Sequence, residues 1–272
     1  MTDLYLDEDQ LERYSRHIIM EGMGPEGQRA LLDASVLVVG AGGLGSPVIQ
    51  YLAAAGVGTL HVVDDDVVER SNLQRQTIHR DADEGRPKVE SAAEFVRSLN
   101  PDVEVVPHET ELTPENAMDF VEGVDHVVDC SDNFRTRFIV NDACTLAGVP
   151  FSHGAVFRYE GQVITFPGDD DSPCYRCLHP EAPPEDAVPD CATAGVLGAV
   201  PGTVGTIQAT ETIKGLMDAG EVLDGRLLFY DAERMDFDEI EVAKNPACPV
   251  CGEDPAIDSL EEVEYRDDCA IE

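Results

Sequence analysis

"VLVVGAGGLGSPVIQYLAAAGVGTLHVVDDD", residues Val36–Asp66, decides the fold. An apolar run enters three glycines, Gly40, Gly42 and Gly45, as a buried parallel strand does where it turns into a helix. A second apolar run ends at Asp64, where a carboxylate can accept a hydrogen bond from a ribose hydroxyl. The order of these features favours a site for an adenosine-containing ligand over a plain tight turn. It does not distinguish NAD from another nucleotide.

The same alternation of strands and helices continues to Pro150. It predicts an α/β protein with a Rossmann-like, doubly wound, mostly parallel sheet that antiparallel strands extend. The expected strands are Ala34–Val39, Thr59–Val63, Val103–Pro107 and Asp125–Asp129, and the expected helices are Pro47–Ala55 with Ser46 as its cap, Lys88–Leu99 and Phe134–Ala147.

After Pro150 the pattern changes to a hairpin, a long Pro-, Asp- and Gly-rich crossing loop, one helix and two strands. We expect one domain over residues 1–272, with a helical segment at 1–30, a nucleotide-binding half at 31–150, a partner-binding half at 151–252 and a frayed acidic tail at 253–272. The expected elements are a helix at Glu8–Met20, hairpin strands Val156–Tyr159 and Gln162–Phe166 around Glu160-Gly161, a loop at Pro167–Pro201, a helix at Thr203–Leu216, and strands Arg226–Tyr230 and Phe237–Val242.

Charge sets this chain apart from an average globular protein. It carries 55 Asp and Glu against 18 Lys and Arg, a formal net charge of -37, with lysine only at Lys88, Lys214 and Lys244. The acid is spread from end to end, which favours adaptation to high salt over binding of a basic partner. We therefore expect a haloarchaeal, cytoplasmic protein. The lack of a basic face argues against stable nucleic-acid binding, and neither a membrane span nor a signal peptide is predicted.

Basic residues nevertheless gather in one stretch. Five of the 18 lie between positions 70 and 88, namely Arg70, Arg75, Arg80, Arg86 and Lys88. The glycine loop already holds a pyrophosphate, so additional cations indicate a triphosphate and a phosphoryl-type transition state. The alternative is a surface helix with ordinary ion pairs.

The fourth expected strand ends at "DCSDN", which should reach the same edge of the sheet as the glycine loop. Asp132 and Asn133 lie there, and a carboxylate beside a triphosphate is a natural Mg²⁺ ligand. The alternative for Asp132 is that it only caps the helix that begins near Phe134.

Cysteines provide the sharpest local signal. "CYRC" and "CPVC" are two C-x-x-C knuckles whose four thiolates suit a structural, tetrahedral Zn²⁺ site, with a redox or iron–sulfur site as the alternative. The four residues are Cys174, Cys177, Cys248 and Cys251.

The other four cysteines lie outside these knuckles. Cys130 and Cys144 fit inert core positions, and Cys269 lies in the tail. Cys191, in the crossing loop, is the candidate nucleophile for an acyl group, with an incidental loop thiol as the alternative. None of the seven histidines has metal-ligand spacing, and we expect all of them to be structural.

Eight motifs in order make this chain resemble the MoeB/ThiF family of adenylyltransferases, which are related to ubiquitin-activating enzymes. They are "RYSRHI", "GAGGLGSP", "DDDVVERSNLQRQ", "GRPKVESA", "DCSDN", "PCYRC", "CATAGV" and "NPACPVCG". The resemblance implies ATP-dependent activation of the C-terminal Gly-Gly of small ubiquitin-like β-grasp proteins. That activation serves protein conjugation or sulfur transfer, including molybdopterin synthesis and tRNA thiolation.

The resemblance also implies roles for individual residues. Asp64 would bind the ribose, Asp132 would bind Mg²⁺, Arg16 would reach the ATP of the other subunit in a homodimer, Cys191 would form a thioester, and the knuckles would bind zinc. The nucleotide-binding set that the resemblance implies is Gly42, Gly43, Asp64, Asp66, Ser71, Asn72, Arg75, Gln76, Lys88, Asp132 and Asn133.

Because the sequence ends soon after the second knuckle, we expect no rhodanese domain and a persulfide donor on another protein. Three rival interpretations remain open: an NAD-dependent oxidoreductase, an ATP-dependent enzyme acting on tRNA, and a non-enzymatic zinc scaffold. The basic stretch argues against the first of them, and the lack of a basic face argues against the second.

Overall fold

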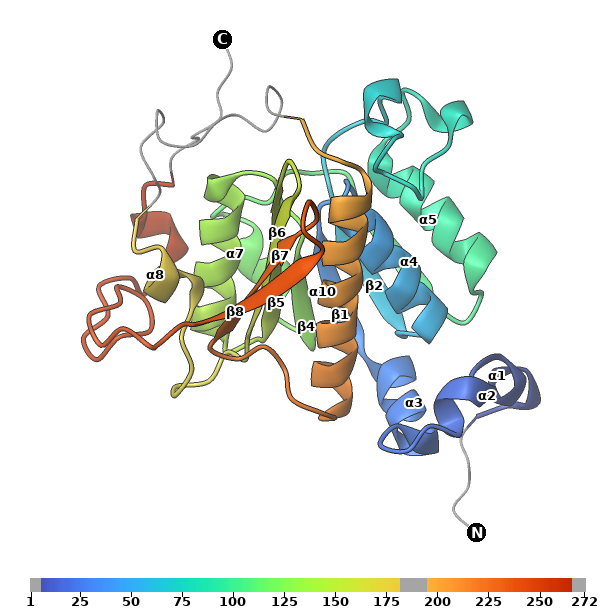
Figure 1. Ribbon diagram of the computed structural model, residues 1–272, viewed down its shortest axis with the longest axis horizontal. Coiled ribbons are helices and arrows are strands. Elements are labelled where there is room, and N and C mark those ends of the chain that lie inside the picture. Colours follow the sequence, from blue (N-terminus) through green and yellow to red (C-terminus); the bar gives the residue numbers. More distant parts are fainter. Residues whose placement is uncertain (1–5, 182–194, 266–272) are drawn as a thin grey trace.

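One eight-stranded sheet organises the molecule (Figure 1). The structure, a computed structural model, describes residues 6–181 and 195–265. The strand order is β3-β2-β1-β4-β5-β6-β7-β8, parallel from β3 to β5 and antiparallel from β5 to β8. The strands are β1 Ser35–Val39, β2 Thr59–Val63, β3 Glu104–His108, β4 His126–Asp129, β5 Phe151–Phe157, β6 Glu160–Phe166, β7 Arg226–Asp231 and β8 Asp236–Glu241. The predicted fold class is confirmed.

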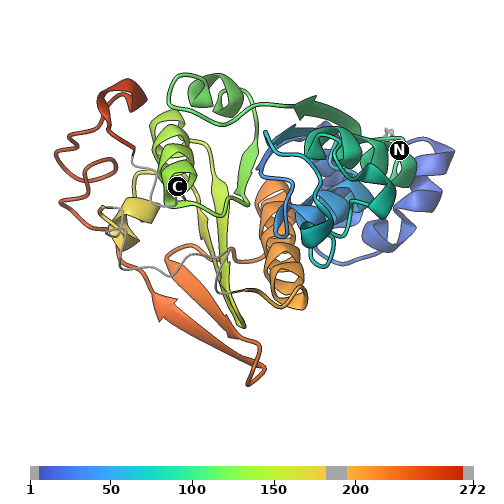
Figure 2. The same cartoon turned by 90° about the horizontal axis from the view of Figure 1, so that it is seen from above.

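Helices cover both faces of the sheet (Figure 2). Alternate apolar residues of β1 point to opposite faces: Val36 and Val38 pack with α4, α5 and α10, while Leu37 and Val39 pack with α6 and α7. The longer helices are α3 Gly24–Asp33, α4 Gly45–Ala55, α5 Lys88–Leu99, α7 Phe134–Ala147 and α10 Ala199–Met217, and the shorter ones are α1 Glu8–Arg13, α2 Ser15–Ile18, α6 Ala117–Val121 and α8 Tyr175–Leu178. Three-residue 3₁₀ turns are η1 Arg70–Asn72, η2 Asp81–Asp83 and η4 Leu260–Glu262.

The glycine loop leads into α4 earlier in the sequence than the predicted cap at Ser46 implies. α4 begins at Gly45 rather than at Pro47, and Ser46 does not cap it: the side chain is buried, and its hydroxyl has no hydrogen-bond partner among the described residues. A Cβ at Gly45 would lie 1.9 Å from the carbonyl oxygen of Gly40. The close approach of these two glycines therefore sets the start of the helix.

Two predicted boundaries in the periphery are wrong. The expected N-terminal helix is broken at Tyr14, whose buried hydroxyl accepts a hydrogen bond from Asn100 (2.8 Å). The hairpin turns at residues 158–159, where Arg158 has a φ of 54°, rather than at Glu160-Gly161. In both places a tertiary contact or turn geometry overrides the local pattern.

The C-terminal segment is docked rather than frayed as far as Tyr265. Leu260 is buried against α7, and the Tyr265 hydroxyl donates to Asp142 (2.8 Å). α8 also lies inside the predicted crossing loop. In the described part of the chain, no helix is long and apolar enough to cross a membrane.

Candidate nucleotide site and four-cysteine cluster

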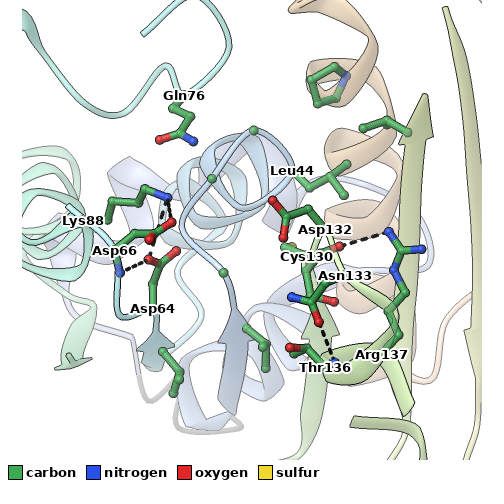
Figure 3. Close-up of a pocket in the computed structure, with 18 of the residues that line it drawn as sticks. Leu44, Asp64, Asp66, Gln76, Lys88, Cys130, Asp132, Asn133, Thr136 and Arg137 are labelled. Carbon is green, nitrogen blue, oxygen red and sulfur yellow. Dashed lines mark hydrogen bonds and ion pairs between the residues drawn. The ribbon is translucent and has the colours of Figure 1, made fainter. Parts of the chain in front are cut away.

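A cavity of about 750 Å³ opens at the carboxyl ends of β1, β2 and β4. The glycine loop crosses it, with Lys88, Asp64 and Asp66 on one side and Asp132, Asn133 and Arg137 on the other (Figure 3). This is the edge of a parallel sheet where open α/β folds bind ligands. Of the predicted nucleotide-binding residues, nine line the cavity: Gly42, Gly43, Asp64, Asp66, Arg75, Gln76, Lys88, Asp132 and Asn133.

Two backbone amides hold the carboxylate of Asp64 in place at the end of β2. Oδ2 accepts from the Ala41 amide (2.8 Å), and Oδ1 accepts from the Asp66 amide (2.9 Å). Burial raises the pKa of Asp64 above its ordinary value, while the nearby Lys88 ammonium and the two amides oppose that rise. A carboxylate fixed in this way is an oriented acceptor for a hydroxyl pair.

Lys88 is the first residue of α5 and is only 5% exposed. Its Nζ lies 2.7 Å from Asp66 Oδ2 and 3.9 Å from Asp64 Oδ1. A buried ammonium needs such partners because burial of an isolated charge is costly. Its position at the cavity wall provides a fixed cation for an anionic ligand.

The basic stretch contributes less to the cavity than its sequence density suggests. Only Arg75 and Lys88 line it. Arg70 pairs with Glu84 (2.8 Å), Arg86 pairs with Asp83 and Glu94, and Arg80 is exposed outside the cavity. The five cations therefore do not form one cationic patch, because acids in the same stretch neutralise Arg70 and Arg86.

Ser71 and Asn72 are in the predicted nucleotide-binding set but do not line the cavity. The Asn72 Oδ1 accepts from the Arg75 guanidinium (2.9 Å), and the Ser71 carbonyl accepts from the same group (3.4 Å). These contacts hold Arg75 where it lines the cavity with Gln76. Gln76 is buried, and its Oε1 has no hydrogen-bond partner in the described part of the chain.

Asp132 and Asn133 divide two tasks at the end of β4. The Asn133 side chain caps α7 by accepting from the Thr136 amide (2.8 Å), so the alternative role of Asp132 as the cap is wrong. The exposed Asp132 carboxylate makes no hydrogen bond or ion pair within residues 6–181 and 195–265, and it faces the cavity (Figure 3). A free carboxylate at this edge suits a hard divalent cation.

Sequence reasoning missed Arg137. It lines the cavity from the second turn of α7 and is 9% exposed, and its guanidinium lies 4.9 Å from the centre of the Phe134 ring. Its Nε has no hydrogen-bond partner among the described residues. The sequence did contain a signal for it. Arg137 lies four positions after Asn133, the N-cap of α7, and so belongs to the end of the helix that faces the cavity.

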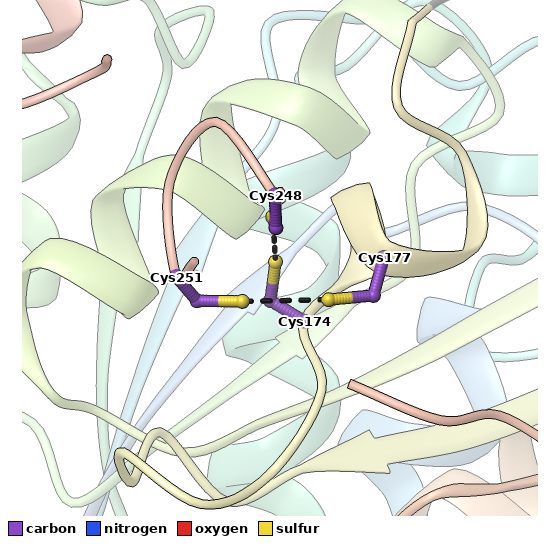
Figure 4. Close-up of side chains that lie close together, drawn as sticks. All are labelled: Cys174, Cys177, Cys248 and Cys251. Atoms are coloured by element: carbon purple, nitrogen blue, oxygen red, sulfur yellow. Dashed lines mark hydrogen bonds between the residues drawn. The ribbon is translucent and has the colours of Figure 1, made fainter. Parts of the chain in front are cut away.

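The four knuckle cysteines meet as predicted (Figure 4). All four Sγ atoms lie within 4.8 Å of one another, with Cys174 and Cys248 at 3.5 Å and Cys177 and Cys251 at 3.4 Å. Tetrahedral Zn²⁺ with Zn–S bonds of about 2.3 Å spaces sulfurs about 3.8 Å apart, so this donor set fits zinc.

The cluster is fastened to α7 by polar contacts. The Tyr175 amide donates to Asn141 (2.7 Å), and the guanidinium of Arg176 makes two hydrogen bonds to the buried carboxylate of Asp142. The segment 260–265, which we call the strap, contacts the same carboxylate through the Tyr265 hydroxyl. The cluster therefore connects the crossing segment, the C-terminal region and the helix that begins at the cavity.

The remaining predicted residues are more remote or are not described. Arg16 is exposed on α2 and does not line the cavity of its own chain. Cys191 and Cys269 lie outside the described residues. Burial raises the pKa of Cys130 and Cys144 well above that of a free thiol, which agrees with their expected inertness.

A Rossmann-like sheet, a cavity lined by both cations and carboxylates, and a cluster of four cysteines that could hold a metal ion together define a nucleotide-binding α/β protein. The chain belongs to the ThiF family, whose model matches residues 14–250.

Curated relatives agree over most of the chain. It is 61% identical to the SAMP-activating enzyme E1 of Haloferax volcanii, over 98% of each chain. It is 48% identical to the sulfur carrier protein adenylyltransferase of Thermus thermophilus, over 97% of this chain and 98% of that protein. It is also 48% identical to the adenylyltransferase and sulfurtransferase MOCS3 of Bos taurus, over 95% of this chain but 57% of that protein.

Solved structures give the same fold. The crystal structure of Escherichia coli MccB matches with a TM-score of 0.80 at 20% identity, and the match covers 93% of this chain and 75% of that one. At this identity the likeness concerns the fold alone.

Proposed function

We propose that this protein adenylylates the C-terminal glycine of a small ubiquitin-like or sulfur-carrier protein with ATP. The partner's carboxylate oxygen attacks the α-phosphorus, the bond from that phosphorus to the bridging oxygen breaks, and pyrophosphate leaves with the electron pair. The products are an acyl-adenylate and pyrophosphate. Relatives named as activating enzymes and adenylyltransferases, at 61% and 48% identity over nearly the whole chain, support this reaction.

The observation that carries the proposal is the buried Lys88, which shares one cavity with Arg75, Asp64 and the exposed Asp132. Fixed cations stabilise the negative charge that develops on the phosphates as the bond breaks. Arg137 adds a third cation on the opposite side of the glycine loop, and within residues 6–181 and 195–265 its Nε has no hydrogen-bond partner. An NAD site needs no such set of cations, because the glycine loop alone holds a pyrophosphate.

Two metals belong to the proposal. Asp132 would hold Mg²⁺, which neutralises phosphate charge when it is bound. The four cysteines would hold a structural Zn²⁺ that joins the crossing segment to the C-terminal region.

We further propose a homodimer in which Arg16 acts on the other subunit's site. Arg16 is exposed and remote from its own cavity, and the neighbouring Ile19 and Met20 are 73% and 53% exposed. Exposed apolar side chains beside a functional arginine are typical of a subunit interface.

Cys191 would accept the activated glycine as a thioester in protein conjugation. For sulfur transfer, in molybdopterin synthesis or tRNA thiolation, the outer sulfur of a persulfide on a donor protein would attack the acyl carbon of the adenylate, forming an acyl disulfide and releasing AMP. The dispersed acidic charge and the Haloferax relative support a haloarchaeal, salt-adapted cytoplasmic enzyme without stable nucleic-acid binding.

Pyrophosphate exchange tests the reaction. Enzyme, Mg²⁺, ATP and a Gly-Gly-ending protein from the same cell should exchange labelled pyrophosphate into ATP. Lys88→Ala should lower the exchange rate by about 10²- to 10³-fold, because a fixed transition-state cation is lost. Lys244→Ala, outside the cavity, is the matched control. Absence of exchange with every such partner, or tighter binding of NAD than of ATP, would refute the proposal.

Two further measurements separate the finer claims. Mixing inactive Arg16→Ala and Lys88→Ala proteins should restore about a quarter of wild-type activity, since half of the dimers are mixed and each has one intact site. No recovery after verified subunit exchange contradicts the intersubunit role.

Non-reducing mass spectrometry should find a thiol-labile adduct on Cys191 that Cys191→Ser lacks, whereas adenylate alone indicates direct sulfur transfer.

A further inference from the structure

His79 occupies a buried junction between three segments that form the nucleotide cavity. Its Nε2 lies 2.9 Å from the carbonyl oxygen of Ala41, in the glycine loop. Its Nδ1 lies 2.8 Å from the hydroxyl of Ser91, on α5. His79 itself ends the turn that carries Arg75 and Gln76, because its amide donates to the Gln76 carbonyl. One imidazole therefore contacts all three segments.

The proton positions on this ring follow from its partners. A carbonyl only accepts, so Nε2 carries the proton that is donated to Ala41, and Nδ1 accepts from Ser91 when the ring is neutral. Burial lowers the pKa of His79, which favours that neutral form. The Ser91 hydroxyl has a single proton, which it can donate to Asp83 Oδ2 (3.1 Å) or to His79 Nδ1 (2.8 Å). Asp83 also accepts from Arg86 and from the Arg80 amide, so its carboxylate keeps two donors when the Ser91 proton points to His79.

The peptide groups before and after Ala41 are therefore each fixed by a hydrogen bond. Its amide donates to Asp64 and its carbonyl accepts from His79, at 2.8 and 2.9 Å. The direction of these two peptide groups determines how the Gly42–Gly43 backbone is presented to the cavity. On the other side of the ring, Ser91 lies one turn along α5 from Lys88.

We propose that His79 is a positioning residue for the nucleotide: it fixes the Ala41 carbonyl and so sets the glycine loop against Lys88. This inference rests on the proposed function, because it concerns binding of ATP in that same cavity. His79 does not line the cavity itself and acts through the loop.

Two substitutions of similar character separate the contacts of the ring. In His79→Gln the terminal amide nitrogen takes the place of Nε2 and can still donate to Ala41. In His79→Asn the terminal amide takes the place of Nδ1: its oxygen can still accept from Ser91, and the contact with Ala41 is lost. Both variants replace the imidazole ring by a smaller, acyclic side chain that ends in a buried primary amide. Both should therefore lower thermal stability to a similar extent.

The test is calorimetric titration of ATP into folded wild-type and variant enzymes, followed by pyrophosphate exchange. We expect His79→Asn to raise the Kd and KM for ATP about tenfold, since a buried hydrogen bond is lost, with little change in kcat or in KM for the Gly-Gly partner. His79→Gln should stay within about threefold of wild type. Ser91→Ala should shift the ATP affinity in the same direction by less.

Failure of this inference can be told apart from failure of the proposed function. A wild-type enzyme that neither binds ATP nor exchanges pyrophosphate overturns the function. A wild-type enzyme that does both, with equal ATP affinity in wild type, His79→Asn and His79→Gln, overturns the positioning role. Equal losses in both variants that follow thermal stability, or a loss in kcat alone, would instead assign His79 to core packing and overturn the proposal.

Discussion

The two halves of this molecule are held together by different forces. In residues 31–150, parallel strands and helices alternate, and the strands β1 and β4 are buried almost throughout. In residues 151–265, the sheet ends in the antiparallel pair β7 and β8, and every residue of β8 is exposed. The first half is stabilised mainly by apolar burial, roughly 25 cal/mol per Å².

The second half shares the apolar core through β5, β6 and α10, and its outer part is fastened by a small number of long-range contacts, which we call clamps. Cysteines at 174 and 177 meet those at 248 and 251, Arg176 pairs with Asp142, and Tyr265 binds the same carboxylate. Each clamp joins parts of the chain that are far apart in sequence. Loss of one clamp should therefore loosen the second half selectively and leave the nucleotide-binding half folded.

Loss of the cysteine cluster should have the largest effect. Replacing Cys248 and Cys251 by Ser, or removing zinc with a chelator, should cost on the order of 5 kcal/mol of local stability, because metal binding contributes directly to folding. Amide hydrogen exchange should accelerate in α8, β7 and β8 and change little in α4 and α5. Cys144→Ala, a buried thiol outside the cluster, is the control. Equal acceleration in both halves, or no bound zinc in the wild type, would contradict this expectation.

The contrast between the halves also explains what the sequence could predict. Periodicity located the strands β1 and β2 and the helices α5 and α7, because a buried strand or an amphipathic helix has its pattern within a few residues. It missed α6 and α8, it gave no bounds for α3 within the helical segment expected at 1–30, and it left the C-terminal region unstructured. The docking of that region depends on Leu260 and Tyr265 finding α7, which no local pattern records.

The site shows the same division. The glycine spacing, Asp64 and the C-x-x-C pairs were found because backbone geometry or coordination fixes the distances between such residues along the chain. Arg137 was missed because its approach to the cavity depends on how α7 sits on the sheet. Conversely, Arg70 and Arg86 were counted in the basic cluster that indicated an anion, but counting charges along the chain cannot show which acid each one pairs with.

The buried ion pair Arg176–Asp142 should come next in size. Arg176→Met leaves the Asp142 carboxylate buried without its main partner, which costs about 3–5 kcal/mol in the free energy of unfolding. Chemical denaturation monitors this loss. The exposed pair Arg29–Asp33 is the matched control, and Arg29→Met there should cost less than about 1 kcal/mol. Similar losses for the two variants would show that burial does not distinguish the pairs.

His126 tests the junction between the halves. It lies on β4, its Nε2 lies 2.9 Å from the Ser152 hydroxyl on β5, and burial lowers its pKa to about 3. The unfolded chain, with a histidine pKa of about 6.5, binds this proton more readily, so stability is lost as the pH falls from about 6.5 toward 3. Between pH 7 and pH 5 the loss should be about 2 kcal/mol for this group alone.

The comparison that isolates this histidine is His126→Gln, whose amide nitrogen can keep the contact with Ser152 but does not titrate. Denaturant unfolding at pH 7 and pH 5, in buffers of matched high salt, should show a smaller acid-induced loss in the variant. A pH dependence identical to that of the wild type would mean that His126 is not the group that takes up the proton.

Removal of one hydrogen bond from the strap should have the smallest effect. Tyr265→Phe deletes the hydroxyl that donates to Asp142 and leaves the ring against the core, so it should cost about 1 kcal/mol. Because Arg176 still neutralises the carboxylate, this loss should be several times smaller than that of Arg176→Met. Exchange should accelerate around η4, at Leu260–Glu262, before it does so in β7. Tyr159→Phe, on an exposed ring, is the control and should change neither the free energy of unfolding nor the exchange rates. A loss of stability in Tyr159→Phe equal to that in Tyr265→Phe would show that the strap does not stabilise the fold.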